Sequence, residues 1–248
     1  MNKTLEICCY TFNSAVQAGI AGADRIELCD NYFEGGTTPS YAVIESAVST
    51  LAIPVNVIIR PRGGNFNYSQ KEFEIILKDI EIAKSIGANG VVTGILKPDG
   101  MLDIKRMEKI VDAAGFMEVT FHRAFDVCRN PLETMEILIG MKVTRILTSG
   151  GAQKADEGIG AIATFVERAS GRIEIMPGSG ITDRNLQQLV NQTGATAFHS
   201  SAKTFQKSGN NPIVMGSEPV GENNLITVDT KMIEKMAAIL HKENSTTG

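Results

Sequence analysis

The feature of this 248-residue chain that most restricts its fold is an alternation, repeated eight times, of short apolar runs with longer amphipathic stretches. The apolar runs are rich in β-branched residues, which favour strands, and the stretches between them have helical periodicity. We predict strands at 5–10, 25–30, 54–62, 90–96, 118–126, 145–151, 172–180 and 197–203. Strands that alternate with helices in this way form parallel sheets joined by right-handed crossovers.

Local signals mark where the predicted helices start and stop. Ser69 and Glu72 have the spacing of a capping box, in which each side chain bonds a backbone amide at the helix start. Other helix starts are predicted at Asp103, Asn130 (before Pro131), Thr182 and Asp229. Three predicted helices end just before a strand at Gly22, Gly87 and Gly194. Glycine suits these positions because it tolerates the left-handed conformation that ends a helix.

Eight strand–helix units predict a single α/β domain over residues 1–248, a closed (β/α)8 barrel of the TIM type. An open, doubly wound parallel sheet is the alternative architecture. We expect a polar loop at about 204–226 before the last helix and a disordered tail at about 243–248.

The composition excludes several classes of protein. A formal net charge of −4 provides no basic stripe, so nucleic acid is not an expected partner. No apolar stretch approaches the roughly 20 residues that a membrane span needs, and the first residues lack the pattern of a signal peptide. The four cysteines are therefore expected to be free thiols in a cytoplasmic protein. The oligomeric state stays open, with a homo-oligomer among the alternatives.

Polar residues gather at the carboxyl ends of the predicted strands, which is where (β/α)8 barrels carry their active sites. These residues are Glu27, Arg60, Arg62, His122, Arg123, Asp126, Ser149, Ser179, His199 and Ser200. Side-chain alternation predicts that Glu6, Cys8, Glu27 and Cys29 face the barrel interior, while Cys9 faces the helices. On the fifth strand the same alternation directs His122 inward.

This polar mouth supports one hypothesis, an enzyme that acts on a small phosphorylated or otherwise anionic metabolite. The candidate catalytic residues are Glu27, His122, Arg123 and Asp126. His122 or a glutamate would move a proton. The candidate anion-binding residues are Arg60, Arg62, Gly178, Ser179, Gly180, His199 and Ser200. Several of them lie in MPGSGI (176–181) and HSSA (199–202), after the seventh and eighth strands, where many barrels bind phosphate.

A purely structural role is the alternative for the same residues. An interior carboxylate must be paired, and Arg60 on the next strand is the expected partner of Glu27. Glu6, Glu27, Arg60 and Arg123 would then form a buried ion network. The glycines of 176–181 would serve only to make a tight turn.

Metal binding is a further hypothesis. Cys8 and Cys29 occupy equivalent places on neighbouring predicted strands, so their sulfurs could approach each other. Two thiolates at short range suit Cu(I), with Met176 or His122 as supplementary ligands. The alternative is that both cysteines are simply buried, as free cysteines often are. The spacings do not indicate a structural zinc site.

Several blocks of the sequence together resemble the CutC-like copper homeostasis family. They are LEICC, GADRIELC, EGGTTPSY, IIRPRGGNFNYS, TFHRAFDVCRNP, ILTSGG, IMPGSGI and FHSSA, in order from Leu5 to about Ala202. The resemblance implies a cytoplasmic (β/α)8 barrel that binds Cu(I) through cysteines, with no settled catalytic reaction.

The residues that match the family blocks are the candidate site residues. Cys8 and Cys29 are the candidates for copper, the FHRAFD block contains His122, Arg123 and Asp126, and the RPRGG block contains Arg60 and Arg62. Cys9 departs from the family, which more often has an aliphatic residue there. If copper binds, Cys8 and Cys29 should lie close enough to share an ion.

Overall fold

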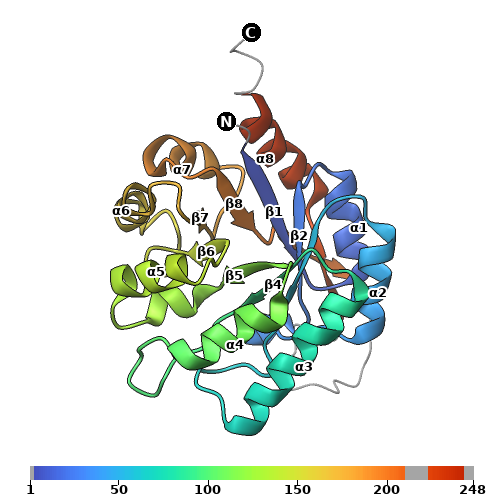
Figure 1. Ribbon diagram of the computed structural model, residues 1–248. Helices are drawn as coiled ribbons and strands as arrows, with labels where there is room; N and C mark the ends of the chain where they lie inside the picture. Colours follow the sequence, from blue (N-terminus) through green and yellow to red (C-terminus); the bar gives the residue numbers. More distant parts are fainter. Residues whose placement is uncertain (1–2, 210–222, 243–248) are drawn as a thin grey trace.

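The eight apolar runs form eight parallel strands that curve into a barrel with the helices outside (Figure 1). The computed structural model describes residues 3–209 and 223–242. The barrel strands are β1 (Thr4–Cys9), β2 (Arg25–Leu28), β3 (Val55–Ile58), β4 (Gly90–Thr93), β5 (Glu118–Phe121), β6 (Arg145–Thr148), β7 (Glu174–Pro177) and β8 (Ala197–Ser200). They pair in the order β7-β6-β5-β4-β3-β2-β1-β8, and β7 contacts β8 at the remaining seam. This sequential order confirms the (β/α)8 barrel, because a doubly wound sheet would reverse its strand order near the middle.

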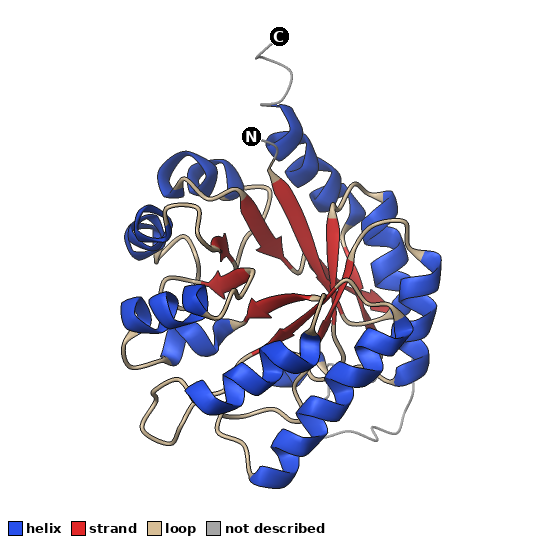
Figure 2. Cartoon of the chain, in the orientation of Figure 1, coloured by secondary structure: helices blue, strands red, loops and turns tan. Residues whose placement is uncertain are grey.

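Helices cover the outside of the barrel (Figure 2). They are α1 (Phe12–Ile20), α2 (Tyr41–Thr50), α3 (Gln70–Ile86), α4 (Ile104–Ala114), α5 (Pro131–Gly140), α6 (Ile159–Ala169), α7 (Leu186–Thr193) and α8 (Thr230–Lys242). Two short 3-10 helices, η1 (Tyr32–Glu34) and η2 (Arg123–Val127), follow β2 and β5. Within residues 3–209 and 223–242, no helix has the length and apolar character to cross a membrane.

Most of the predicted helix boundaries are confirmed. Ser69 and Glu72 make both bonds of the capping box at the start of α3, and Asp103 accepts the Arg106 N–H at the start of α4. Thr182 is a wrong prediction, because α7 begins later, at Leu186. The Thr182 hydroxyl instead accepts the Arg184 N–H in a local turn.

The glycines that end three helices have the predicted left-handed backbone. Their φ angles are 100° at Gly22, 91° at Gly87 and 71° at Gly194. Each glycine turns the chain into the strand that follows, as the sequence predicts.

Seven of the eight predicted strands are shorter in the structure, and two of these differences bear on the site. β3 ends at Ile58 rather than near residue 62, and β5 ends at Phe121 rather than at residue 126. The segment after β5 becomes η2, whose start His122 caps by accepting the Ala124 N–H at Nδ1. The polar residues beyond the two strand ends therefore lie in the loop after β3 or in η2. Their side chains do not follow the strand alternation, so a long side chain can turn toward more than one partner.

Side chains alternate between a helix-facing core and the barrel interior, as predicted. Leu5, Ile7 and Cys9 of β1 belong to the large core that packs against the helices. Cys8 and Cys29 belong to a separate apolar group inside the barrel.

The amino-terminal half of the barrel interior holds a basal ion network of Glu6, Arg25, Glu118, Arg145 and Glu174. Arg25 Nε lies 2.5 Å from Glu6 Oε2, and Arg145 Nε lies 2.5 Å from Glu174 Oε2. Arg145 Nη2 also contacts Glu118 Oε2 at 3.0 Å. The network therefore joins strands around the floor of the barrel.

The segment predicted as a polar loop contains strands at both described ends. β9 (Lys203–Lys207) pairs in antiparallel with β10 (Asn224–Val228), and the hairpin leads into α8. Every residue of β9 is exposed, which explains why its sequence looks like a loop. Residues 210–222 of the predicted loop and the predicted tail at 243–248 lie outside the described residues.

Candidate metal centre at the barrel mouth

A cavity of about 600 Å³ opens at the carboxyl ends of the strands. Its wall includes residues from seven of the eight barrel strands or the loops that follow them, among them Cys8, Glu27, Arg60, His122 and His199. The mouth is thus both open and polar, as the enzyme hypothesis requires.

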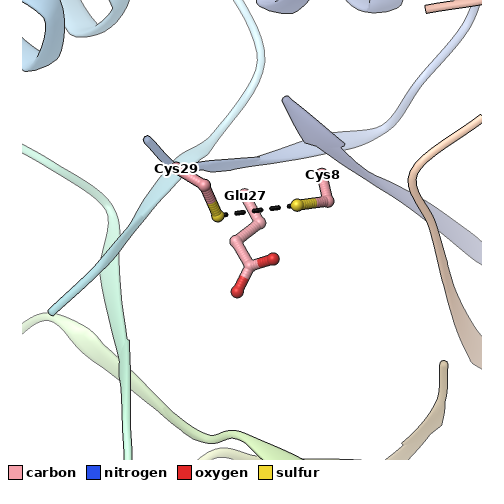
Figure 3. A group of neighbouring side chains, drawn as sticks. All are labelled: Cys8, Glu27 and Cys29. Carbon is pink, nitrogen blue, oxygen red and sulfur yellow. Dashed lines mark hydrogen bonds between the residues drawn. The ribbon is translucent and has the colours of Figure 1, made fainter. Parts of the chain in front are cut away.

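Three of the predicted interior residues form a cysteine cluster of Cys8, Glu27 and Cys29 (Figure 3). The two sulfurs lie 3.5 Å apart, and the cluster's three ligand atoms lie within 4.8 Å of one another. The β1–β2 register places Cys8 opposite Glu27, and Cys29 follows two residues later on the same face. The predicted approach of Cys8 and Cys29 is therefore present.

The cysteine cluster fits a soft metal ion. Metal–sulfur bonds of about 2.3 Å place two thiolates bound to one ion roughly 3.8–4.6 Å apart. The two sulfurs would therefore need to move apart only slightly to bind an ion between them. Two thiolates and one carboxylate form a soft, anionic donor set. Met176, a predicted supplementary ligand, packs with Leu147 and Ala197 and not with the two cysteines, and its Sδ accepts a hydrogen bond from Arg25 Nη2.

His199 sets the electrostatics beside the cluster. Its Nδ1 lies 2.8 Å from Glu6 Oε1 and its Nε2 lies 3.5 Å from Glu27 Oε2. Burial alone would lower the pKa of His199, but Glu27, Cys8 and Glu6 together raise that pKa well above its usual value. His199 is therefore a buried cation between the basal ion network and the cysteine cluster.

The two cysteines differ in protonation. The hydrogen bond from Cys29 holds the pKa of the Cys8 thiol well below its usual value, against the opposing effect of burial, and His199 adds to the lowering. Burial and the neighbouring Cys8 raise the pKa of Cys29, and the same two causes raise that of Glu27. The lowered pKa of Cys8 favours its thiolate form, which is the form that binds a metal, and an entering cation would displace protons from the other two groups.

Arg60 does not pair with Glu27, so that prediction is wrong. Its Nη1 donates to the carbonyl oxygens of Glu34 at 2.6 Å and Gly36 at 2.8 Å, and its Nη2 donates to that of Gly64 at 2.9 Å. Because β3 ends at Ile58, the guanidinium is carried up to these loops. Arg60 shapes the rim of the cavity.

The predicted network of Glu6, Glu27, Arg60 and Arg123 does not form either. Arg25 and His199 neutralise Glu6 instead, and their effect outweighs burial and holds the pKa of Glu6 well below its usual value. Arg123 binds Asp126, with Nε 2.7 Å from Oδ2.

Arg62 lies outside the cavity lining, although the sequence places it among the anion-binding candidates. Its Nε contacts Glu72 Oε1 at 2.5 Å, and its other nitrogens donate to Gly63, Asn65 and Asn67. The side chain therefore fixes the 62–68 loop to the start of α3.

Asp126 is a hub of accepted hydrogen bonds. Its carboxylate accepts from Arg123 Nε, from the Thr148 hydroxyl at 2.5 Å, from the Ser149 N–H and hydroxyl, and from the Gly151 N–H. With its oxygens used in this way, Asp126 is suited to holding Arg123 and the loop after β6 in place.

His122 lines the cavity as a neutral ring. Burial and the positive charge of Arg60 lower the pKa of His122 to about 3. Its Nδ1 accepts the Ala124 N–H at 3.2 Å, so the ring proton lies on Nε2. That Nε2 is buried and has no hydrogen-bond partner within the described part of the chain.

The predicted anion loops lie only partly at the cavity. Ser179 and Gly180 line it, whereas Gly178 and Ser200 do not. The Gly178 N–H donates to Thr148, and the Ser200 hydroxyl donates to Ile181 at 2.6 Å. Since α7 begins only at Leu186, its N-terminus does not directly follow this loop.

The comparisons with known proteins agree with the family resemblance of the sequence blocks. The sequence pattern of the CutC family matches residues 3–204. The chain belongs to the CutC family. A human copper homeostasis protein cutC homolog is 43% identical over 240 residues, covering 95% of this chain and 88% of the relative. A CutC family protein of Parabacteroides distasonis is 46% identical over 225 residues, covering 89% and 93%.

Solved structures lead to the same family. The crystal structure of a putative copper homeostasis protein CutC from Streptococcus agalactiae has a TM-score of 0.77 at 36% identity, covering 80% of this chain and 98% of that one. A phosphoribosyl anthranilate isomerase from Thermotoga maritima has a TM-score of 0.59 at 13% identity, covering 97% and 99%. The second likeness shows the barrel fold alone.

The rim of this CutC family cavity contains residues that the sequence does not single out. Tyr10 and Tyr32 stack edge to face with centroids 5.3 Å apart, and Lys203 of β9 donates to the Tyr32 hydroxyl. Phe33 and Ser201 also line the cavity. Tyr32 and Phe33 follow β2 as an aromatic pair, but no pattern in the sequence brings β9 next to them.

Proposed function

We propose that this chain binds Cu(I) as cargo at Cys8 and Cys29, with Glu27 as a third ligand, and buffers or delivers it in copper homeostasis. The observation that carries the proposal is the 3.5 Å separation of the two sulfurs on neighbouring strands inside the barrel. Thiolates prefer Cu(I) over the harder divalent ions. The copper homeostasis names of the human and streptococcal relatives support the same metal.

The charges around the cysteine cluster also favour the binding of a cation. Two thiolates and Glu27 would give three negative charges, which Cu(I) and protonated His199 would offset in part. The cytoplasmic location expected from the sequence belongs to the same proposal, because a reducing compartment keeps both cysteines as thiols.

An anaerobic Cu(I) competition titration tests this function. We expect tight, stoichiometric binding in the native protein and its loss in the Cys8→Ser, Cys29→Ser double variant. The matched controls are Cys9→Ala, whose sulfur faces the helix-side core, and Cys128→Ser, at the half-buried fourth cysteine. Binding that survives the double variant, or is lost equally in the controls, would contradict the proposal.

The cavity supports a second function, catalysis on a small phosphorylated or otherwise anionic metabolite. Its wall brings His122, Arg123 and His199 together with Ser179 and Gly180, which copper binding alone does not require. Glu27, His122 and Arg123 would carry the chemistry, with Asp126 holding Arg123. A thermal-shift screen with small phosphates and carboxylates tests it, because a ligand that binds only the folded state raises the unfolding temperature.

A further inference from the structure

The wall of the cavity opposite the cysteine cluster presents hydrogen-bond donors. In the circular strand order, β1 and β2 contribute Cys8 and Glu27, whereas the segments after β5 and β7 contribute His122, Arg123 and Gly180. The two sides therefore offer different chemistry, sulfur and carboxylate on one and N–H groups on the other.

Among the residues that the structure describes, His122 Nε2 is a donor without a partner. The ring is 5% exposed, and its Nδ1 is already committed to the Ala124 N–H. A buried N–H left unbonded is destabilising, so a native protein keeps one where a ligand or a water completes it. Phe66 packs against the ring with centroids 4.7 Å apart and limits its movement.

Arg123, the next residue, is held from behind. Its Nε donates to Asp126 Oδ2 at 2.7 Å and its Nη2 donates to Ser149 Oγ at 2.9 Å. These bonds do not use Nη1, and the side chain is 41% exposed where it lines the cavity. A guanidinium fixed in this way is preorganised for an anion, because little conformational entropy remains to be lost.

We propose that His122 and Arg123 form a recognition site for a small organic anion in which a carbonyl oxygen lies next to a carboxylate or phosphate. Arg123 takes the anionic group, and the Nε2–H of His122, which the side-chain packing covers in the free protein, becomes accessible on binding and donates to the carbonyl oxygen. A neutral imidazole suits this oxygen because it can polarise a carbonyl without transferring a proton. The proposal deepens the second function above and does not depend on copper.

The test compares probes with and without the carbonyl on the copper-free protein. Pyruvate carries a carbonyl beside a carboxylate, dihydroxyacetone phosphate carries one near a phosphate, and inorganic phosphate carries none. We expect at least one carbonyl probe to bind about tenfold or more tightly than inorganic phosphate, and the better of the two identifies the anionic group. All three affinities are measured by titration calorimetry.

His122→Asn and His122→Gln form a matched pair of variants. Asparagine can keep an acceptor for the Ala124 N–H but lacks a donor at the Nε2 position, whereas glutamine can place its amide N–H there. We expect His122→Asn to lose the tenfold preference for the carbonyl probe and His122→Gln to keep part of it. Arg172→Gln is a control for net charge. It removes one positive charge from a surface ion pair with Glu136 and should leave the affinity for every probe unchanged.

A readout on the unmodified protein covers the case in which a variant fails to fold. The chain has three histidines, so ¹⁵N-histidine labelling gives few signals to assign. We expect a His122 ring protonated on Nε2, whose signal moves when the carbonyl probe is added. A proton on Nδ1, or no movement on binding, would overturn the proposal. Carbonyl probes that bind equally well to His122→Asn would overturn it but leave the anion function standing. No binding of any probe at millimolar concentration would overturn both.

Discussion

The floor and the mouth of the barrel both contain buried polar groups, but they differ in how completely those groups are paired. On the floor, Glu6 is paired with Arg25, and Arg145 is paired with both Glu118 and Glu174. At the mouth, the sulfurs of Cys8 and Cys29 form a hydrogen bond mainly with each other, and His122 Nε2 has no hydrogen-bond partner in the described chain.

This difference indicates which polar groups serve the fold and which are available to a ligand. Removing one partner from a satisfied network leaves a buried charge alone and destabilises the protein. Removing a group that has no partner leaves no other group unpaired, so its loss should lower ligand affinity more than it lowers the stability of the fold. Asn56 is an exception near the floor, because its buried Oδ1 has no partner among the described residues although its Nδ2 lies 3.5 Å from Glu6.

The largest effect is expected from breaking the floor with Arg145→Met. This variant leaves Glu174 without its 2.5 Å partner and frees Glu118 as well. We expect the free energy of unfolding, measured by urea denaturation, to fall by about 3 kcal/mol, the low end for a buried ion pair, because Glu118 and Glu174 are partly exposed. Cu(I) affinity in the folded protein should stay unchanged. A loss below about 1 kcal/mol would show that the basal ion network does not hold the barrel together.

Asp126→Asn should have the next largest effect, although Asp126 belongs to the mouth. Its side chain is 4% exposed and accepts bonds from Arg123, Thr148 and Ser149. Replacing one carboxylate oxygen by an NH2 group sets donor against donor, which we expect to cost about 2–3 kcal/mol in urea unfolding. Stability equal to that of the native protein would indicate that Asp126 is free for another role.

The neutral state of His122 predicts a dependence of stability on pH. The pKa of His122 is about 3 in the folded protein, while a histidine in the unfolded chain has a pKa near 6.5. The unfolded state therefore binds more protons between these values, and stability falls as the pH falls from about 6.5 toward 3.

Comparing the native protein with His122→Asn isolates this effect. Between pH 7 and pH 5 we expect the native protein to lose about 2 kcal/mol more than the variant does. Urea unfolding at both pH values measures it. An equal loss in the two proteins would mean that the His122 ring is solvated or paired.

Glu27→Gln should have the smallest effect on the free energy of unfolding and a measurable effect on Cu(I) affinity. Glu27 belongs to the cysteine cluster, and in the described part of the chain its one close cationic partner is His199 at 3.5 Å. We expect Cu(I) affinity to fall about tenfold, which is about 1.4 kcal/mol, in a competition titration. Glu34→Gln is the control, since Glu34 lines the same cavity outside the cluster. Equal losses in the two variants would indicate a general charge effect instead of a ligand.

The sequence is sufficient to predict the barrel and the inward direction of Cys8, Glu27 and Cys29. Both follow from short-range periodicity, because the strand–helix alternation and the side-chain alternation can be read within a few residues. The 3.5 Å approach of the sulfurs then results from two neighbouring strands in parallel register.

The partners of the long side chains could not be predicted in the same way. Arg60 reaches carbonyl groups in two loops, because β3 ends before it and its guanidinium can turn toward several acceptors. His199 meets Glu6 across 193 positions of sequence, which requires the barrel to close between β8 and β1. Such contacts depend on loop paths and barrel closure, which no local pattern specifies.

X-ray absorption at the copper edge of the Cu(I)-loaded protein tests the central proposal most directly. If copper binds at the cysteine cluster, the ion should have two sulfur neighbours and one oxygen neighbour, and the oxygen should disappear or lengthen in Glu27→Gln. A copper ion surrounded only by nitrogen and oxygen, or one whose sulfur shell persists in the Cys8→Ser, Cys29→Ser double variant, would contradict a copper site at the barrel mouth.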